Sequence, residues 1–242
     1  MAKKKAIEII FEDDHIIVLN KAPGMLTLSD RYAPDKASLH KYLLDKYGEI
    51  FTVHRLDKET SGVILFAKTA KAHREFSMMF EHRNIQKFYL TLLEGQLYNE
   101  VIEVDKAIAP STTQKNKMIV HARGKASKSI FRTKETFKKF TLVEVEILTG
   151  RTHQIRVHAE SIGYPLSVDA IYGVRPALKA SHIKGRKFKA KMDKEERPLI
   201  SRSILHASRL CFVHPITKEK HDISADLPKD FRAVVSQLRK WD

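Results

Sequence analysis

The stretch 54–62 places a carboxylate, Asp57, between two basic side chains, Arg55 and Lys58. The apolar run 63–67 follows at once and is typical of a buried strand. Functional groups are often found in loops that a rigid element supports, so Asp57 is a candidate catalytic group. The same residue types are also common in plain turns, and the stretch alone does not exclude that reading.

A second candidate lies in a predicted helix that begins near Thr152, a potential N-cap, and ends at Gly163. Ile155 and Ala159 recur at helical spacing and predict the buried face of this helix. Arg156 then lies about one turn from the helix start, where the backbone N–H groups and the helix dipole already favour an anion. An arginine at this position is suited to holding a carboxylate.

Two histidines on this helix suggest a metal site or a general base, and neither interpretation is favoured. His153 and His158 are five residues apart, whereas a metal pair on a helix needs a spacing of four. The chain also has a single cysteine, Cys211, and lacks G-x-S-x-G, G-x-G-x-x-G and Walker patterns. The sequence therefore predicts no metal and no nucleotide cofactor.

The composition points to a polyanionic partner. The chain of 242 residues has 44 Lys and Arg against 29 Asp and Glu, a formal net charge of +15. Such a surplus favours nucleic acid first and an anionic membrane surface second. No basic amphipathic helix, signal peptide or stretch of transmembrane length is found, so we expect a cytoplasmic protein without membrane contact. Cys211 lies in an apolar run and is expected to be a buried, inert thiol.

The positive charge is concentrated in one polar segment, at about 174–202. Its basic residues are Arg175, Lys179, Lys184, Arg186, Lys187, Lys189, Lys191, Lys194, Arg197 and Arg202. A cationic loop of this kind binds the phosphates of a nucleic acid without recognising its base sequence. A solvated loop with no ligand is the alternative.

The remaining patterns predict the elements that support these groups. Apolar runs around an acidic turn predict a hairpin at 7–19, and alternating runs predict strands at 87–93, 141–148 and 204–213. In the strand 87–93, Tyr89 is expected to face away from the more apolar side. Helices are predicted after the potential caps Ser38 and Thr69, and after Pro228 at the C-terminal end. We therefore predict one α+β domain over residues 1–242, built on a mixed, mostly antiparallel sheet.

Several motifs in register resemble the RluA family of RNA pseudouridine synthases. They are His54-Arg55-Leu56-Asp57 with Thr60-Ser61-Gly62, Lys87-Phe88-Tyr89 with Gly95, and Gly150-Arg151-Thr152-His153-Gln154-Ile155-Arg156-Val157-His158 with Gly163, Pro165, Asp169 and Tyr172-Gly173. Asn20-Lys21-Ala22-Pro23-Gly24, Leu205-His206-Ala207, Phe212 and His214-Pro215 also fit. The resemblance runs from about residue 8 to about residue 225.

The resemblance implies a curved sheet with flanking helices and an active-site cleft across its middle. It implies that Asp57 is the catalytic aspartate, that Tyr89 packs on the target base, and that Arg156 pairs with the aspartate. Arg55 corresponds to an arginine that helps to displace the target nucleotide. Further RNA contacts are expected at His54, Arg151, His153, Lys184, Arg186 and Lys187.

The implied reaction is an isomerisation, an intramolecular transfer that converts uridine to pseudouridine in ribosomal or transfer RNA. The uracil leaves C1' of the ribose, rotates and rejoins through C5, without net redox change, so no cofactor is expected. Asp57 could attack C1', attack the uracil ring or remove a ribose proton. The base must first be flipped from its stack, which an aromatic platform such as Tyr89 assists, and Tyr89 is a hypothetical relay for the C5 proton.

Many relatives carry an N-terminal RNA-binding module of the S4 type, whereas here the catalytic pattern begins within about ten residues of Met1. We therefore expect the catalytic domain, as a monomer, to recognise the RNA by itself. Two other functions remain as alternatives. One is a non-catalytic protein that binds or folds RNA, and the other is a metal-dependent RNA hydrolase.

Overall fold

The computed structural model describes residues 7–29, 36–189 and 195–241. The chain folds as two compact units, the first made of Met1–Phe88 with His206–Asp226 and the second of Tyr89–Leu205 with Leu227–Asp242. That the two units make up one domain, as expected from the sequence, stays a prediction.

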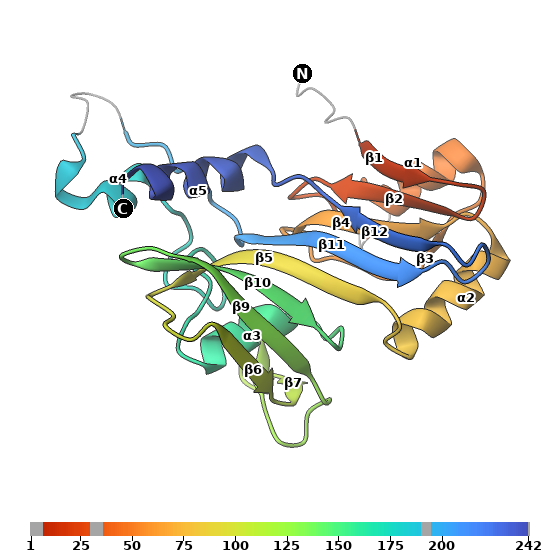
Figure 1. Ribbon diagram of the computed structural model, residues 1–242, viewed down its shortest axis with the longest axis horizontal. Helices are drawn as coiled ribbons and strands as arrows, with labels where there is room; N and C mark the ends of the chain where they lie inside the picture. The colour runs from red at the N-terminus through yellow and green to blue at the C-terminus, as the bar shows by residue number, and fades with distance from the viewer. Residues whose placement is uncertain (1–6, 30–35, 190–194, 242) are drawn as a thin grey trace. The chain divides into compact units, whose positions relative to one another are not determined.

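The first unit is built on strands that lie in the order β1, β2, β4, β11 (Figure 1). These strands are β1 (Glu8–Glu12), β2 (Ile16–Lys21), β4 (Ser61–Ala67) and β11 (Leu205–Val213), with β3 (Phe51–Thr52) paired to β4 and β12 (Lys220–Ser224) paired to β11. The predicted hairpin of β1 and β2 is confirmed, because the two strands pair antiparallel. The carboxylate of Asp13 closes its turn by accepting the backbone N–H groups of His15 and Ile16, each at 2.7 Å.

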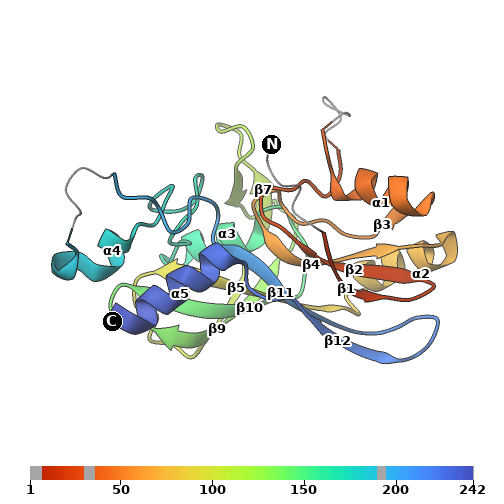
Figure 2. The same cartoon turned by 90° about the horizontal axis from the view of Figure 1, so that it is seen from above.

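Two helices of the first unit begin at the predicted caps. Ser38 accepts the N–H of Lys41 at the start of α1 (Leu39–Tyr47), and Thr69 accepts that of Ala72 at the start of α2 (Ala70–Glu81). Figure 2 shows both helices from above. Phe76 of α2 packs edge-on against Phe212 of β11, with ring centroids 5.5 Å apart, in the apolar core of this unit.

The sequence spacing predicts that Leu39, Tyr42, Leu43 and Tyr47 share one face of α1, and the buried part of that face is narrower. Leu39 and Leu43 are buried as expected, but Tyr42 is 44% exposed. The helix has only nine residues, so only the side chains one turn apart on its inner side, Leu39 and Leu43, are covered.

The second unit contains strands in the order β5, β10, β9, β6. These are β5 (Gln86–Glu94), β10 (Phe140–Ile147), β9 (Lys128–Thr136) and β6 (Val101–Asp105), and a separate hairpin pairs β7 (Ile108–Pro110) with β8 (Met118–Val120). The alternation predicted for β10 is confirmed, since Val143, Val145 and Ile147 are buried while Glu144 and Glu146 are partly exposed. Helices α3 (Gln154–Ser161) and α5 (Lys229–Trp241) supply apolar side chains to the same core. The helical spacing in α5 predicts one apolar face, and its four residues (Phe231, Val234, Val235 and Leu238) are all buried.

The start of one helix in the second unit corrects the sequence analysis. Helix α3 is capped by His153, with a left-handed φ of 56°, and not by Thr152. In β5, Tyr89 lies on the strand face opposite Phe88, Leu90 and Leu92, and Thr91 and Leu93 on its own face are completely buried. Tyr89 itself is half-buried against the core of this unit. Strand β5 is therefore covered on both faces, which explains why its sequence lacks a clear polar and apolar alternation.

The basic segment is not a loop throughout. It contains α4 (Ala180–Lys184) and a 3-10 turn at Gly185–Lys187, and Leu178 pairs with Ile200 through an isolated bridge. Helix α4 lies beside α5 (Figures 1 and 2). Lys191 and Lys194 lie outside the described residues.

The fold class is the predicted one, α+β with a mixed and mostly antiparallel sheet. A parallel pair joins β4 to β11, where Ser61 and Gly62 pair with His206 and Ala207. No helix within the described ranges is both long and apolar enough to cross a membrane.

Candidate active site

Asp57 lies in an irregular loop directly before β4, as predicted. Its side chain is half-buried, and its backbone carbonyl accepts the N–H of Thr60 at 3.1 Å, which closes a tight turn. All seven residues of β4 are buried, so the loop is attached to one of the most rigid parts of the first unit. Arg55, two residues before Asp57, is exposed.

A buried lysine holds the Asp57 loop through hydrogen bonds to backbone carbonyls. Lys21, at the end of β2, is only 1% exposed, and its ammonium group donates to the carbonyls of Met25 at 2.8 Å, Lys58 at 3.0 Å and Ala22 at 3.3 Å. The carbonyl of Lys58 also accepts the N–H of Gly24 at 2.9 Å. A buried ammonium group must be compensated by acceptors, and here these acceptors connect the residue after Asp57 to the turn at 22–25. Sequence reasoning did not identify Lys21 as a site residue.

Two further side chains hold the loop before Asp57. The hydroxyl of Thr27, which is 4% exposed, donates to the carbonyl of Leu56 at 3.0 Å and accepts its N–H at 3.3 Å. The Nε2 atom of His54 accepts the N–H of Leu65 in β4 at 3.0 Å. The loop backbone is therefore held by hydrogen bonds on both sides of Asp57.

His54 is held as a neutral imidazole. Its ring stacks on Phe80 of α2 with centroids 4.6 Å apart. Burial, reinforced by the positive charge of Lys87, lowers the pKa of His54 to about 3. The structure thus gives His54 a role in fixing the loop, in addition to the RNA contact predicted for it.

The end of the loop is joined to β11 through Gly62. Its φ is +112°, and a Cβ at this position would lie 2.0 Å from the carbonyl oxygen of Ala207. Only glycine permits this approach. Next to it, Ser61 donates to Nδ1 of His206 at 3.0 Å, while Nε2 of the same ring donates to the carbonyl of Ala225 at 3.1 Å.

Arg156 is the third residue of α3 and is buried, with 7% exposure. Its Nε and Nη2 atoms donate to the two oxygens of Asp169 at 2.6 and 2.9 Å, which is a bidentate ion pair. Burial by itself raises the pKa of the Asp169 carboxyl, but the hydrogen bonds and charge of Arg156 outweigh burial and hold it below the usual value. Arg156 therefore remains opposite an ionised carboxylate within the second unit.

Tyr172 lies against the same guanidinium. The ring centroid is 4.9 Å from Cζ of Arg156, a cation–π distance. The hydroxyl accepts the N–H of Met118 in β8 at 2.7 Å and is 2.9 Å from Nδ1 of His153. Tyr172 thus connects the β7–β8 hairpin, the cap of α3 and Arg156.

The other predicted site residues of the second unit differ in how firmly they are held. Arg151 donates from Nε to the carbonyl of Ala126 at 3.2 Å, and Lys184 lies 4.6 Å from the ring centroid of Trp241. Arg186 and Lys187 are exposed. His158, by contrast, is completely buried between Ser129 and the carbonyl of Lys106, at 2.9 Å from each, which is the environment of a structural histidine.

The first unit brings His54, Arg55 and Asp57 together in one loop. The second unit brings His153 and Arg156 together through Tyr172. The proximity of Asp57 to Tyr89 and Arg156 stays a prediction.

The residues that sequence reasoning missed are those that hold the predicted ones. Lys21 and Tyr172 lie within the family motifs but received no role, and Thr27 lies outside them. All three act through backbone groups of a loop or through a ring face, and no local sequence pattern predicts such contacts. Asp169 was part of the motif set, and its separation of 13 residues from Arg156 was the available signal, but a pair across a loop has no fixed spacing.

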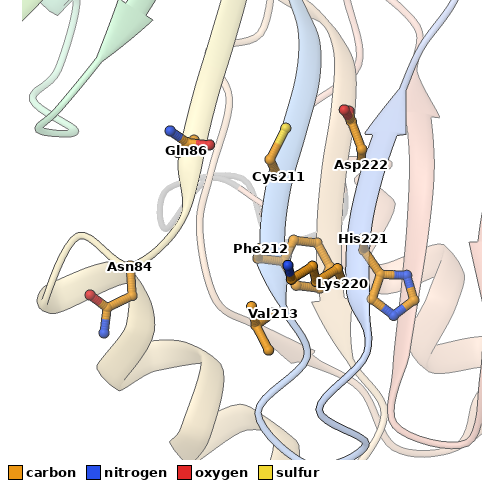
Figure 3. Close-up of a pocket in the computed structure, with 8 residues that line it drawn as sticks. All are labelled: Asn84, Gln86, Cys211, Phe212, Val213, Lys220, His221 and Asp222. Atoms are coloured by element: carbon orange, nitrogen blue, oxygen red, sulfur yellow. The ribbon is translucent and has the colours of Figure 1, made fainter.

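A separate pocket of about 420 Å³ lies on the first unit (Figure 3). It is lined by Asn84, Gln86, Cys211, Phe212, Val213, Lys220, His221 and Asp222, none of which is a predicted site residue. Cys211 is half-buried and lines this pocket, which corrects the expectation of a fully buried thiol. It sits on the strand face opposite Leu210 and Phe212, which fill the core. In the part of the chain that the structure describes, no group of three or more His, Cys, Asp or Glu residues could hold a metal ion.

A comparison with protein families identifies the chain. The model of a family described as RNA pseudouridylate synthase matches residues 15–161, a range that includes Asp57, Tyr89 and Arg156. The chain belongs to this family.

Curated pseudouridine synthases match almost the whole chain. The ribosomal large subunit pseudouridine synthase D of Zymomonas mobilis is 32% identical, over 96% of this chain and 73% of its own length. The ribosomal large subunit pseudouridine synthase C of Vibrio vulnificus is 33% identical, over 96% of this chain and 69% of its own length.

Solved structures of human pseudouridylate synthase domains share the fold. RNA Pseudouridylate Synthase Domain Containing 4 matches with a TM-score of 0.73 and 21% identity, over 96% of this chain and 93% of its own. RNA Pseudouridylate Synthase Domain Containing 1 gives a TM-score of 0.69 and 23% identity, over 97% and 95% of the two chains. The pseudouridine synthase fold is therefore the fold of this chain.

Proposed function

We propose that this chain converts uridine to pseudouridine within RNA and that Asp57 is its catalytic residue. The observation that carries the proposal is the rigid presentation of one carboxylate in a member of this family. Lys21, Thr27 and His54 hold the loop backbone on both sides of Asp57. Two of these side chains, Lys21 and Thr27, are buried, and a turn without a function has no need of buried polar groups directed at its backbone.

The reaction requires one bond to break and one to form. The N1–C1' bond of uridine breaks, the uracil rotates, and the C5–C1' bond forms. C5 then loses its proton and N1 gains one, so atoms and electrons balance without an external reagent. Asp57 promotes this sequence by attack at C1', by attack on the ring or by removal of a ribose proton.

Arg156 and Tyr89 complete the proposed site. Arg156 pairs with Asp57 and orients it, because a guanidinium binds a carboxylate through directional, charge-assisted hydrogen bonds. Tyr89 supports the flipped base, which offsets part of the unstacking cost of a few kcal/mol. Arg55 helps to displace the nucleotide. These residues lie in a cleft at the middle of the sheet, as the resemblance implies.

Ribosomal RNA is the proposed substrate, because the relatives that match most of the chain are named for the large ribosomal subunit. Transfer RNA is the alternative. Phosphate contacts are proposed for Arg151, His153, Lys184, Arg186 and Lys187. We further propose that the protein acts as a monomer in the cytoplasm, where both RNAs are made and modified.

The test is release of tritium from RNA labelled at C5 of uridine. Formation of the C5 glycosidic bond must expel that hydrogen, whichever role Asp57 has. Wild-type protein should release tritium from unmodified ribosomal RNA, and Asp57→Asn, which keeps the shape of the side chain, should release none. Transfer RNA in a separate tube identifies the alternative substrate. Binding of both RNAs without release from either would contradict the proposal and favour a non-catalytic RNA-binding protein.

A further inference from the structure

Arg156 is held by a second buried residue that the proposed chemistry does not use. The side chain of Asp169 is completely buried and accepts five hydrogen bonds. Two come from Arg156, two from the N–H groups of Ile171 and Tyr172 at 2.9 and 3.0 Å, and one from the hydroxyl of Ser203 at 3.0 Å. Since its own orientation is fixed by the backbone, Asp169 can fix that of the arginine.

The contacts of Arg156 with Asp169 and Tyr172 determine how its guanidinium is oriented. Asp169 engages Nε and Nη2, and the ring of Tyr172 lies 4.9 Å from Cζ. The plane and the rotation of the guanidinium are therefore both set within the second unit. The proposed function needs the arginine in one fixed orientation, and these contacts supply it.

We infer that Asp169 is the positioning residue of Arg156: it acts through the arginine on the reaction and does not touch the RNA. This inference rests on the proposed function, because it needs Arg156 to pair with Asp57. An arginine that is 7% exposed and lacks its carboxylate would lose both its orientation and the compensation of its charge. A misplacement of about 1 Å near a reacting group costs roughly 100-fold in rate.

The same unit contains a second bidentate ion pair that serves as the control, although its carboxylate, Asp230, is 30% exposed and that of Asp169 is fully buried. Arg202 donates from Nε and Nη2 to the two oxygens of Asp230 at 2.7 and 2.9 Å, and its side chain is 8% exposed. Asp230→Asn therefore removes the same kind of bidentate pair as Asp169→Asn. Asp230 has no proposed part in catalysis or RNA binding, so this control measures what loss of such a pair does to folding alone.

The experiment compares kcat and KM for RNA in the wild type, Asp169→Asn and Asp230→Asn, at a temperature well below the melting temperatures of all three. We expect Asp169→Asn to lower kcat about 10- to 100-fold while KM stays within about twofold. Asp230→Asn should keep kcat within about twofold, although both variants melt earlier. A kcat for Asp169→Asn near the wild-type value, or equal losses of kcat in both variants, would overturn the inference.

A milder variant covers the case in which Asp169→Asn does not fold. Ser203→Ala removes one hydrogen bond to the Asp169 carboxylate and leaves the ion pair in place. We expect kcat to fall several-fold with unchanged KM, and an unchanged kcat would overturn the inference. A wild-type protein that forms no pseudouridine would instead contradict the proposed function itself, so the two failures are distinguishable.

Discussion

His54 illustrates how one residue links the site to the stability of the fold. Its imidazole accepts the N–H of Leu65, and burial lowers its pKa to about 3. In the unfolded chain the same group titrates near pH 6.5. Between pH 6.5 and about 3 the unfolded state therefore binds more protons than the folded state, and the free energy of unfolding falls as the pH falls.

The prediction is that His54→Gln flattens this pH dependence. Glutamine can accept the N–H of Leu65 through its side-chain oxygen but does not titrate. Between pH 6.5 and 5, the wild type should lose ~1–2 kcal/mol more of its unfolding free energy than the variant, allowing for the partial exposure of the residue. Urea titrations at the two pH values measure this, and equal losses in both proteins would show that His54 is not held neutral.

Tyr89 carries the second prediction at this scale. Tyr89→Phe keeps the aromatic platform and removes the hydroxyl that we propose as a relay for the C5 proton. RNA affinity should stay within about twofold, while turnover falls roughly 100-fold or more, as is typical for loss of a general acid or base. Filter binding and tritium release measure the two quantities. Equal turnover in the variant would eliminate the proton role and leave Tyr89 as a platform alone.

Individual residues could be predicted from the sequence where local spacing constrains them. Asp57 in a loop and Arg156 near a helix start followed from turn signals and helical periodicity. Lys21 and Asp169 could not be assigned, because their contacts with the site, to Lys58 and to Arg156, span 37 and 13 residues and depend on the tertiary fold. Both residues hold the site because they are buried. The sequence does not show which charged residues will be buried.

Among the elements, the parallel pairing of β4 with β11 depends most strongly on one residue type. Gly62 lies so close to Ala207 that an added Cβ would meet its carbonyl oxygen at 2.0 Å. The contact is with backbone, which cannot move aside as a flexible side chain can. The element that supports the Asp57 loop therefore tolerates only glycine here.

Gly62→Ala should destabilise the protein by at least ~3 kcal/mol or prevent folding, because the strand must shift and φ is +112°. Gly150→Ala is the control, since a Cβ at Gly150 has nothing within 4 Å. It should change the melting temperature by no more than about 2 °C. Calorimetry of both variants tests this, and a Gly62→Ala protein as stable as the control would contradict the close approach.

The elements themselves were largely predictable, and the exceptions have physical reasons. Ser38 and Thr69 marked helix starts correctly because an N-cap is a local hydrogen bond. Thr152 did not, because His153 adopts a left-handed φ that places the cap one residue later. Helix α4 was missed because it is five residues long and gains its support from α5, which is distant in sequence.

For the whole molecule, the net charge of +15 is the property that the sequence shows most directly. Among the basic residues of the 174–202 segment, Arg186 and Lys187 are exposed on the turn after α4. Lysines on the helices of the first unit, such as Lys41 and Lys71, are equally exposed. These two pairs carry the same charge, so comparison of them separates a specific RNA-binding surface from general attraction.

Substitution of both Arg186 and Lys187 by Ala should weaken RNA binding. It should also reduce the slope of log Kd against the logarithm of the salt concentration by about 1 to 2. Removal of Lys41 and Lys71 should leave that slope nearly unchanged. Titrations at several salt concentrations, with RNA of the same length, give both slopes. If the two double variants behave alike, the basic segment is only part of a diffuse positive field.

The α+β class and the mostly antiparallel sheet followed from strand patterns and from the family motifs. The parallel β4–β11 contact did not, because it joins residues about 145 positions apart. Pairing at that separation is decided by the packing of the whole unit and not by any window of sequence.

The most direct test of the central claim is a count of nucleosides. Ribosomal RNA without modifications is incubated with wild-type protein or Asp57→Asn, digested completely and analysed for uridine and pseudouridine. We predict that the wild type gains one pseudouridine for each uridine lost and that Asp57→Asn binds the RNA but forms none. Pseudouridine formed by Asp57→Asn at the wild-type rate would contradict the account.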